Sequence, residues 1–176
     1  VLDHRLKDGV DPNISDLDVT IRDCLYYIKW QDQSHYHATW ESSDDLKYHT
    51  GFRRLENYFK NKVKMDLYLN NDPDVAPEEK EKWNLDRERD IESLEDYKKV
   101  ERIIGHRQNL DETEYFVKWK RLNYDSCTWE SDSLIKQIAI NELDQFLDRN
   151  DKVVSCDKNE MQPKTRSAHV PITGSP

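Results

Sequence analysis

Charged and aromatic side chains gather in three places along this chain, and each place suits a different kind of recognition. Between residues 77 and 97 nine acids stand against four bases, so a helix there would carry a rod of negative charge. Between residues 47 and 64 the bases outnumber a single acid and could neutralise DNA phosphates without reading sequence. Four of the five tryptophans lie in two copies of one short string, where they could pack a small sheet or line a site. The bases are Lys47, Arg53, Arg54, Lys60, Lys62 and Lys64.

Residue patterns typical of catalysis or metal binding do not occur in the sequence. His35 and His37 form a His-x-His turn, but no third ligand candidate lies near them, which disfavours a metal site. Cys24, Cys127 and Cys156 are odd in number and widely spaced, which argues against disulfides and zinc and suits a reducing compartment. There is no Gly-rich phosphate loop and no nucleophile–base pair. We therefore expect neither ATPase activity, nor a cofactor, nor a metal in this chain.

The tryptophans belong to a string that occurs twice, 89 residues apart. Tyr26–Trp30 is followed nine residues later by Thr39–Glu41. Tyr115–Trp119 is followed at the same spacing by Thr128–Glu130, and six of the sixteen aligned positions are identical. A repeated fixed spacing predicts two copies of one small domain. The composition agrees, because 36% charged and 35% apolar residues fit two small cores better than one large core.

In the second copy, alternating apolar residues predict three strands followed by a helix. Within the middle strand Tyr115, Val117 and Trp119 share one face. Three antiparallel strands covered by one helix form a minimal stable unit, so we expect an α+β fold made of two such units. The expected elements are strands at 100–104, 115–120 and 128–130 and a helix from about 138 to 149.

The first copy follows the same order with two differences. Val1–Arg5 aligns with Ile103–Arg107, so the chain starts partway along the first strand, and we expect a piece of a longer protein. The first copy also carries a 13-residue insertion at about residues 6–22, whose acids and Pro12 suggest a surface loop. Its helix is expected at about Arg53–Lys60. The inward residues of that helix are Leu55, Tyr58 and Phe59.

We expect a first domain at residues 1–61, a linker at 62–97, a second domain at 98–149 and a flexible tail at 150–176. Pro77 is well placed to begin the acidic helix of the linker, which runs to about residue 97. Its thin apolar stripe predicts a largely solvated helix. No apolar run reaches membrane-spanning length and no signal peptide opens the chain, so we expect a soluble intracellular protein without a membrane partner.

The pattern aromatic–apolar–Lys-Trp, a short turn, Thr-Trp-Glu and a helix resembles the chromodomain. Two copies joined by an acidic helical linker resemble the N-terminal region of chromodomain-helicase-DNA-binding nucleosome remodellers. Ser34–Glu41, Pro77–Glu81 and Val100–Ile104 look most like the subfamily typified by the yeast double-chromodomain remodeller, and suggest a fungal source. The resemblance covers roughly residues 1 to 149. It implies a nuclear protein whose motor, with ATP and Mg, lies beyond Pro176.

The resemblance also implies a methyl-lysine cage built from aromatic side chains. The tryptophans at the family's position are Trp30 and Trp119, but three residues later the chain has Gln33 and Leu122. Tyr97 is the remaining candidate for the second copy. Both cages are therefore depleted, and Trp30 is the best residue to carry what binding remains. The alternative is that all of these tryptophans pack small sheets, which we expect most strongly for the Trp of each Thr-Trp-Glu.

For the acidic helix we weigh a merely solvated charge run against a rod that imitates DNA and docks on the motor's basic face. The resemblance implies the second, because members of this subfamily gate their ATPase in that way. The expected function is a regulatory module that gates its own motor and contacts nucleosomal DNA. The alternative is a reader of the histone H3 tail, and a free-standing enzyme is disfavoured. The gating residues are Glu78, Glu79 and Glu81, extended by Asp86, Glu88 and Asp90.

Overall fold

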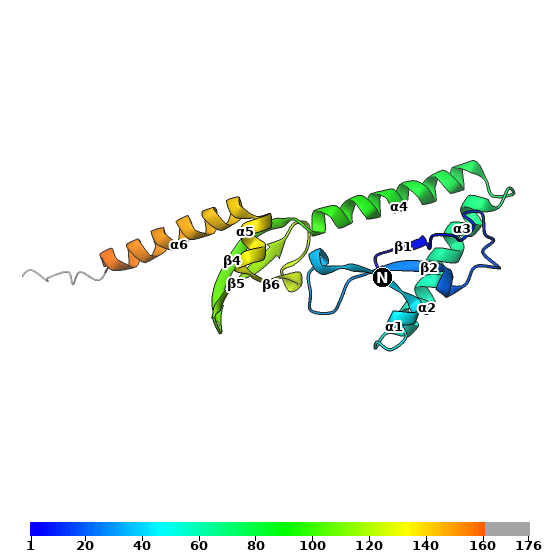
Figure 1. The fold of residues 1–176 in the computed structure, drawn as a ribbon. Coiled ribbons are helices and arrows are strands. Elements are labelled where there is room, and N and C mark those ends of the chain that lie inside the picture. The colour runs from blue at the N-terminus through cyan, green and yellow to red at the C-terminus, as the bar shows by residue number, and fades with distance from the viewer. Residues whose placement is uncertain (161–176) are drawn as a thin grey trace, which may run out of the picture.

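Two three-stranded antiparallel sheets form the framework of the chain in a computed structural model that describes residues 1–160 (Figure 1). In each sheet the second strand in sequence is also the central one. The α+β fold with two copies of one module is confirmed. The first sheet contains β1 (Asp3–Leu6), β2 (Cys24–Ile28) and β3 (Thr39–Ser42), and the second contains β4 (Val100–Asn109), β5 (Glu112–Trp119) and β6 (Thr128–Ser131).

Strand pairing repeats the internal alignment position for position. His4 lies opposite Tyr26 in the first sheet, and the aligned His106 lies opposite Tyr115 in the second. The turn after each central strand also repeats, because the aligned Asp32 and Arg121 have left-handed φ values of 59° and 61°. Each turn leads through a 3-10 helix, η2 (His35–His37) or η4 (Tyr124–Ser126), into the third strand. The duplication thus extends from side chains to backbone conformation.

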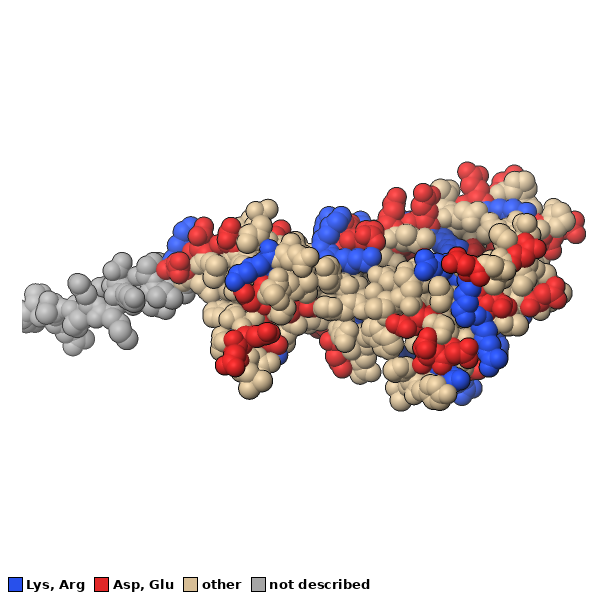
Figure 2. All heavy atoms as spheres, viewed as in Figure 1, with Lys and Arg blue, Asp and Glu red and all other residues tan. Residues whose placement is uncertain are grey.

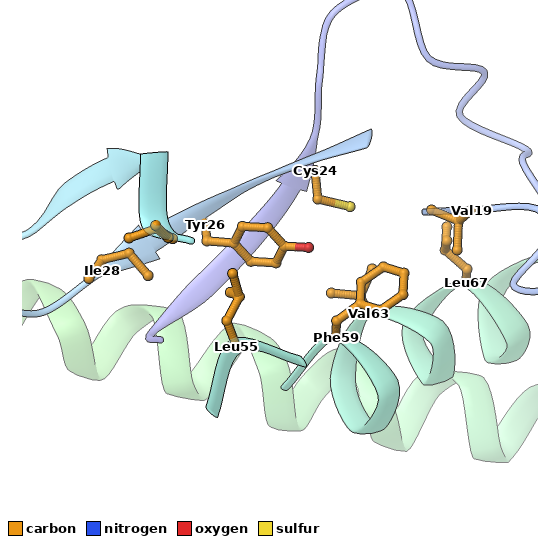
Figure 3. Packing of buried hydrophobic residues seen from close by; sticks show 9 residues of the cluster. Val19, Cys24, Tyr26, Ile28, Leu55, Phe59, Val63 and Leu67 are labelled. Atoms are coloured by element: carbon orange, nitrogen blue, oxygen red, sulfur yellow. The ribbon is translucent and has the colours of Figure 1, made fainter. Parts of the chain in front are cut away.

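The core of the first unit forms where β2 packs on a bent helical run. Cys24, Tyr26 and Ile28 alternate along β2 and point inward, toward Leu55 and Phe59 (Figure 3). Because alternate residues of a strand face one side, one short strand supplies three core side chains. The helices are α1 (Ser43–Leu46), α2 (Phe52–Tyr58), the π-helical η3 (Phe59–Val63) and α3 (Lys64–Asn71).

The helical run is longer than the predicted Arg53–Lys60 and crosses the predicted domain limit at residue 61. Four of its buried residues recur every fourth position, at Leu55, Phe59, Val63 and Leu67. In an α-helix that spacing drifts by about 40° per step, because four residues exceed one turn. The wider turn of η3 offsets the drift and keeps all four on one face. The first ten or so residues of the predicted linker therefore belong to this core.

The insertion in the first unit is more than a surface loop. Val19 is 3% exposed and joins the core, with Ile14 and Ile21 packed partly against it. The short helix η1 (Ile21–Asp23) then leads into β2, and the Tyr26 hydroxyl donates to the Ile21 carbonyl at 3.0 Å. The acids of the loop suggested full exposure, but the apolar residues between them close one end of the core.

The second unit follows the sequence prediction closely along its strands. Tyr115, Val117 and Trp119 are buried on one face of β5, as predicted. Two helices, α5 (Asp132–Ile138) and α6 (Ile140–Glu160), follow β6, where one was expected. Helix α6 continues past residue 149, so residues 150–160 are helical rather than a flexible tail. The remainder of the predicted tail lies outside the described residues.

Helix α4 (Pro77–Tyr97) joins the two units and confirms the predicted limits of the acidic helix. Figure 1 shows it running along the first unit and ending beside the second sheet, while α6 points away on the far side. None of the helices within residues 1–160 has the length and apolar character needed to cross a membrane. In that same range no three His, Cys, Asp or Glu side chains are grouped as metal ligands would be.

Candidate functional site

One face of α4 is fastened to the first unit by polar contacts. The Lys80 ammonium donates to the Asp72 carbonyl at 2.7 Å, and the Trp83 indole N–H donates to Asp66 at 2.8 Å. Arg87 then bridges two carboxylates. Residues 80, 83 and 87 are three and four positions apart, so they lie on one side of a helix. This spacing turns the Lys–Trp–Arg side of α4 toward α3 and β1.

Arg87 is the centre of this attachment. Its guanidinium pairs with Asp66, contacts Asp3 Oδ1 at 3.1 Å, and donates to the His4 carbonyl at 2.9 Å. His4 lies with Nε2 3.4 Å from Asp66 and with Nδ1 3.1 Å from the Tyr58 hydroxyl. Residues of β1, α2, α3 and α4 thus meet in one network, which we call the Arg87 cluster: Asp3, His4, Tyr58, Asp66, Trp83 and Arg87.

The Arg87 cluster holds the Asp66 carboxylate charged. Burial raises the pKa of Asp66, but the contacts with His4 and Trp83 and the charge of Arg87 outweigh it and lower that pKa to about 2. Burial likewise lowers the pKa of Arg87, but Asp66 and Asp3 together raise it above its ordinary value. Because the Asp66 side chain is only 13% exposed, its charge depends on these partners.

The gating candidates divide between two sides of α4, because Asp86 and Asp90 line a cavity with Arg87 and residues of the first unit, whereas the four glutamates do not. Red carboxylate spheres project from the outer side of this helix in Figure 2. Among residues 1–152 only Asp86 of the six has an ion-pair partner, Arg89 at 2.8 Å. Two of the four bases of α4, Lys80 and Arg87, are engaged with the first unit. The exposed candidates are Glu78, Glu79, Glu81, Glu88 and Asp90, and Asp86 is half-buried.

The far end of α4 is tied to the second unit. The Asp96 carboxylate forms ion pairs with Lys99 at 2.9 Å, Lys120 at 3.2 Å and Arg121 at 3.3 Å. The hydrogen bonds from Lys99 and Lys120 hold the pKa of the Asp96 carboxyl below its usual value. Lys120 and Arg121 directly follow β5, so these ion pairs join the end of α4 to the second sheet. The rod is therefore fixed at both ends.

The two units also touch each other through the His-x-His turn. His37 Nε2 lies 2.8 Å from Glu130 Oε2, and the Glu130 side chain is 5% exposed. The His35 ring lies 5.2 Å from the ring of Tyr97. These histidines were expected to be simple turn residues, and here they make contacts between the units. Tyr97, the remaining cage candidate of the second copy, therefore lies against the His-x-His turn of the first unit.

The tryptophans of the two Lys-Trp pairs have different surroundings. Trp119 is 1% exposed and packs inside the second core beside Leu122, so the predicted cage role of Trp119 is not supported. Trp30 is half-buried and lines an open cavity together with Gln33. Both indoles donate to the aligned threonine at 3.0 Å, so the backbone frame is the same. Three positions later, Leu122 packs against the second core, whereas Gln33 lines the cavity beside Trp30.

The tryptophans of the two Thr-Trp-Glu strings face outward, where packing was expected. Trp40 is 36% and Trp129 is 38% exposed. Each is covered on one face by an aligned arginine, with Arg5 4.5 Å from the Trp40 ring centroid and Arg107 4.2 Å from that of Trp129. These stacks shield indoles on the outer side of each sheet, where no helix covers them.

The predicted DNA contact residues share the helical run but not a single face of it. Lys62 lies over the Trp83 ring at 5.2 Å, facing α4, and Lys64 lies over the Phe59 ring at 5.8 Å. Lys47 is 3.8 Å from Asp44. Within the described residues, Arg53, Arg54 and Lys60 are exposed and have no carboxylate partner. These last three are the bases most available to phosphates.

Comparison with known proteins shows to which family this arrangement belongs. The family model of the Chromo (chromatin organisation modifier) domain matches residues 1–61 and 98–149, which contain the two sheets. The chain belongs to the chromodomain family. Its two units are chromodomains, in tandem and joined by α4.

Relatives of the chain are remodeller-type proteins. It is 31% identical over 156 residues to chromodomain-helicase-DNA-binding protein 1 of chicken (Gallus gallus), and equally to the human protein of that name. It is 36% identical over 124 residues to Protein CHROMATIN REMODELING 5 of Arabidopsis thaliana. These matches cover 86%, 86% and 66% of this chain but only 9%, 9% and 7% of the relatives. The matched region is the chromodomain part, which is not catalytic. The yeast subfamily and the fungal source stay predictions.

Sequence reasoning found the acids of α4 but missed the residues that anchor it. Asp3, Asp66 and Arg87 come from three separate parts of the chain. The available signal was the spacing of Lys80, Trp83 and Arg87 within an otherwise acidic helix. A Trp and an Arg on one side of a solvated helix would have predicted a docking face.

Proposed function

We propose that this chain is the regulatory, chromatin-contacting part of a nuclear ATP-dependent nucleosome remodeller, and that α4 gates the motor. The exposed carboxylates of α4 form a rod of negative charge, which competes with DNA for the basic surface of the motor. Nucleosomal DNA and the chain's own ATPase are then its partners. ATP and Mg belong to that motor.

The division of charge on α4 supports this function best. Two of its bases, Lys80 and Arg87, anchor it to the first chromodomain. Four of its acids are exposed and have no ion-pair partner among the described residues: Glu78, Glu79, Glu81 and Glu88. A helix that only needed to stay soluble could pair its acids with neighbouring bases four residues away. Exposed, unpaired carboxylates on a helix that is fixed at both ends are preorganised to meet a large basic surface.

Reversing Glu78, Glu79 and Glu81 to lysine in the full-length protein tests gating. The gate should open, because the positive rod no longer matches a basic motor surface. We expect ATP hydrolysis on naked DNA to rise roughly fivefold or more, a typical coupling between two sites, while the rate on nucleosomes changes little. The measurement is steady-state ATPase on naked DNA and on nucleosomes.

A matched variant separates gating from net charge. Changing Asp111, Glu112 and Asp144 to lysine alters the charge equally, at exposed positions of the second chromodomain. That protein should keep the wild-type preference for nucleosomes. Equal rates on naked DNA for the wild type and the α4 variant would refute gating by these residues.

The bases of the helical run provide a separate test of DNA contact. Changing Arg53, Arg54 and Lys60 to glutamine should weaken binding of the chain to duplex DNA roughly tenfold or more. It should also reduce the slope of log affinity against log salt by about 2 to 3, one phosphate contact for each base removed. Fluorescence anisotropy over a salt series measures both quantities.

The control removes the same charge from another surface. Lys82, Arg89 and Lys136 are exposed and lie outside the helical run, so their change to glutamine should have a smaller effect. If both variants lose affinity equally, binding depends on net charge alone and this surface is not the contact.

A further inference from the structure

A cavity of about 430 Å³ opens beside Trp30 in the first chromodomain, and none of the residues that line it is an acid. Its aromatic walls include Phe52 and the ring of His49, which lies 5.3 Å from the Trp30 ring. Its cationic walls include Lys29 and Arg54. We call this cavity the Trp30 pocket. It lies where the family resemblance places a cage for a methylated lysine.

The charge of the Trp30 pocket opposes a cationic ligand. Arg54 has no carboxylate partner within the described residues. Lys29 and Arg54 line the pocket and no acid does, so its charge repels an ammonium group and attracts an anion.

We propose that the Trp30 pocket binds an unpaired base of single-stranded nucleic acid together with its phosphate. The face of Trp30 can stack on a base, because every base has an aromatic face. Arg54 and Lys29 can receive the phosphate, an interaction for which a guanidinium has suitable geometry. The polar side chain of Gln33, where the second chromodomain has a leucine, leaves the ring open to such a ligand.

A polynucleotide fits the surroundings better than a phosphopeptide. Arg53 and Lys60 are exposed and unpaired on the adjoining helical run, so positive charge continues beyond the pocket. A polynucleotide carries a phosphate at every residue and can use all of these bases, whereas a phosphopeptide uses one or two. The proposal does not depend on gating by α4.

Charge placed in the pocket gives a test that spares the fold. His49 is exposed and lines the pocket, while its neighbour Tyr48 is 83% exposed and does not line it. We expect His49→Glu to weaken binding of the whole chain to a short fluorescein-labelled oligothymidylate roughly fivefold, because a carboxylate would face the phosphate. Tyr48→Glu introduces the same charge one residue away and should leave affinity within about twofold. Equal affinities of the two variants would overturn the proposal.

Stacking is tested at Trp30 itself. Trp30→Ala should weaken oligothymidylate binding roughly tenfold, and Trp30→Phe should recover most of it, because a smaller ring still stacks. Binding of a duplex should be unchanged by either substitution, which separates this pocket from the DNA contact surface. Wild-type affinity for single strands in Trp30→Ala would refute the site. So would displacement of the oligonucleotide by a trimethyl-lysine or phosphotyrosine peptide at lower concentration than by unlabelled oligothymidylate.

Discussion

Replacing Trp119 by alanine should lower the free energy of unfolding of the second chromodomain by about 3–5 kcal/mol, a large share of what so small a domain possesses. The indole is 1% exposed, packs in a core with Val117 and Ile135, and donates to Thr128. Truncation leaves a cavity and removes the bond that the Thr128 hydroxyl accepts, although this hydroxyl still donates to Glu130 at 2.6 Å. In two-dimensional NMR spectra, the amide resonances of β4–β6 should lose dispersion, while those of β1–β3 stay in place.

The aligned residue supplies the control. Trp30 makes the same indole bond, to Thr39 at 3.0 Å, but is half-buried at the rim of its core. Trp30→Ala should therefore cost about 1–2 kcal/mol and leave the first chromodomain folded, since less apolar area is lost. Similar losses for the two substitutions would show that the two indoles have equal structural roles, contrary to their burial.

The sheets could be predicted from sequence because their signal is local. The alternation of Tyr115, Val117 and Trp119 indicates which side of the strand is buried, and the first copy shows the same pattern. The limits of α4 were also readable, since Pro77 fixes the start of a run of helix formers. These signals need no knowledge of what packs against the element.

Packing between distant segments could not be predicted in the same way. The extension of the first helical run to Asn71 depends on Val63 and Leu67 meeting the sheet and the insertion. The burial of Val19 depends on the same packing contacts. The difference between Trp30 and Trp119 was visible only in hindsight, as Gln33 against Leu122, because the strings around the tryptophans are nearly identical.

For a related reason, only part of the candidate site could be predicted from the sequence. Acids on α4 are countable in sequence, but exposure is a property of how the helix docks. That docking depends on Arg87 finding Asp66, 21 residues away, and Asp3, 84 residues away. Charge composition therefore predicted the rod, and only the folded structure shows which face of it stays free.

Replacing Arg87 by alanine should lower the free energy of unfolding of the first chromodomain with α4 by about 2–3 kcal/mol. Removal leaves the carboxylates of Asp66 and Asp3 beside each other without their shared cation, and the Asp66 side chain is only 13% exposed. The loss is smaller than for a fully buried pair because the Arg87 side chain is 31% exposed. Urea unfolding followed by circular dichroism measures the change.

Arg89→Ala is the matched control, because it removes the same side chain from an exposed pair with Asp86 on the same helix. Such pairs contribute about 0–1 kcal/mol, so this variant should unfold almost like the wild type. Adding Asp66→Asn to Arg87→Ala should recover part of the loss, since the orphaned charge is then gone. Additive losses would mean that the two side chains are not coupled.

The same substitution separates anchoring from charge in the proposed gate. Arg87→Ala leaves every carboxylate of α4 in place but releases the face that positions them. If the rod must be held rigidly to compete with DNA, the full-length variant should hydrolyse ATP on naked DNA faster than the wild type, while Arg89→Ala should not. If rates stay at the wild-type level although hydrogen exchange shows α4 undocked, the charges alone suffice and the anchor serves stability only. Either outcome assigns the Arg87 cluster a role that composition could not.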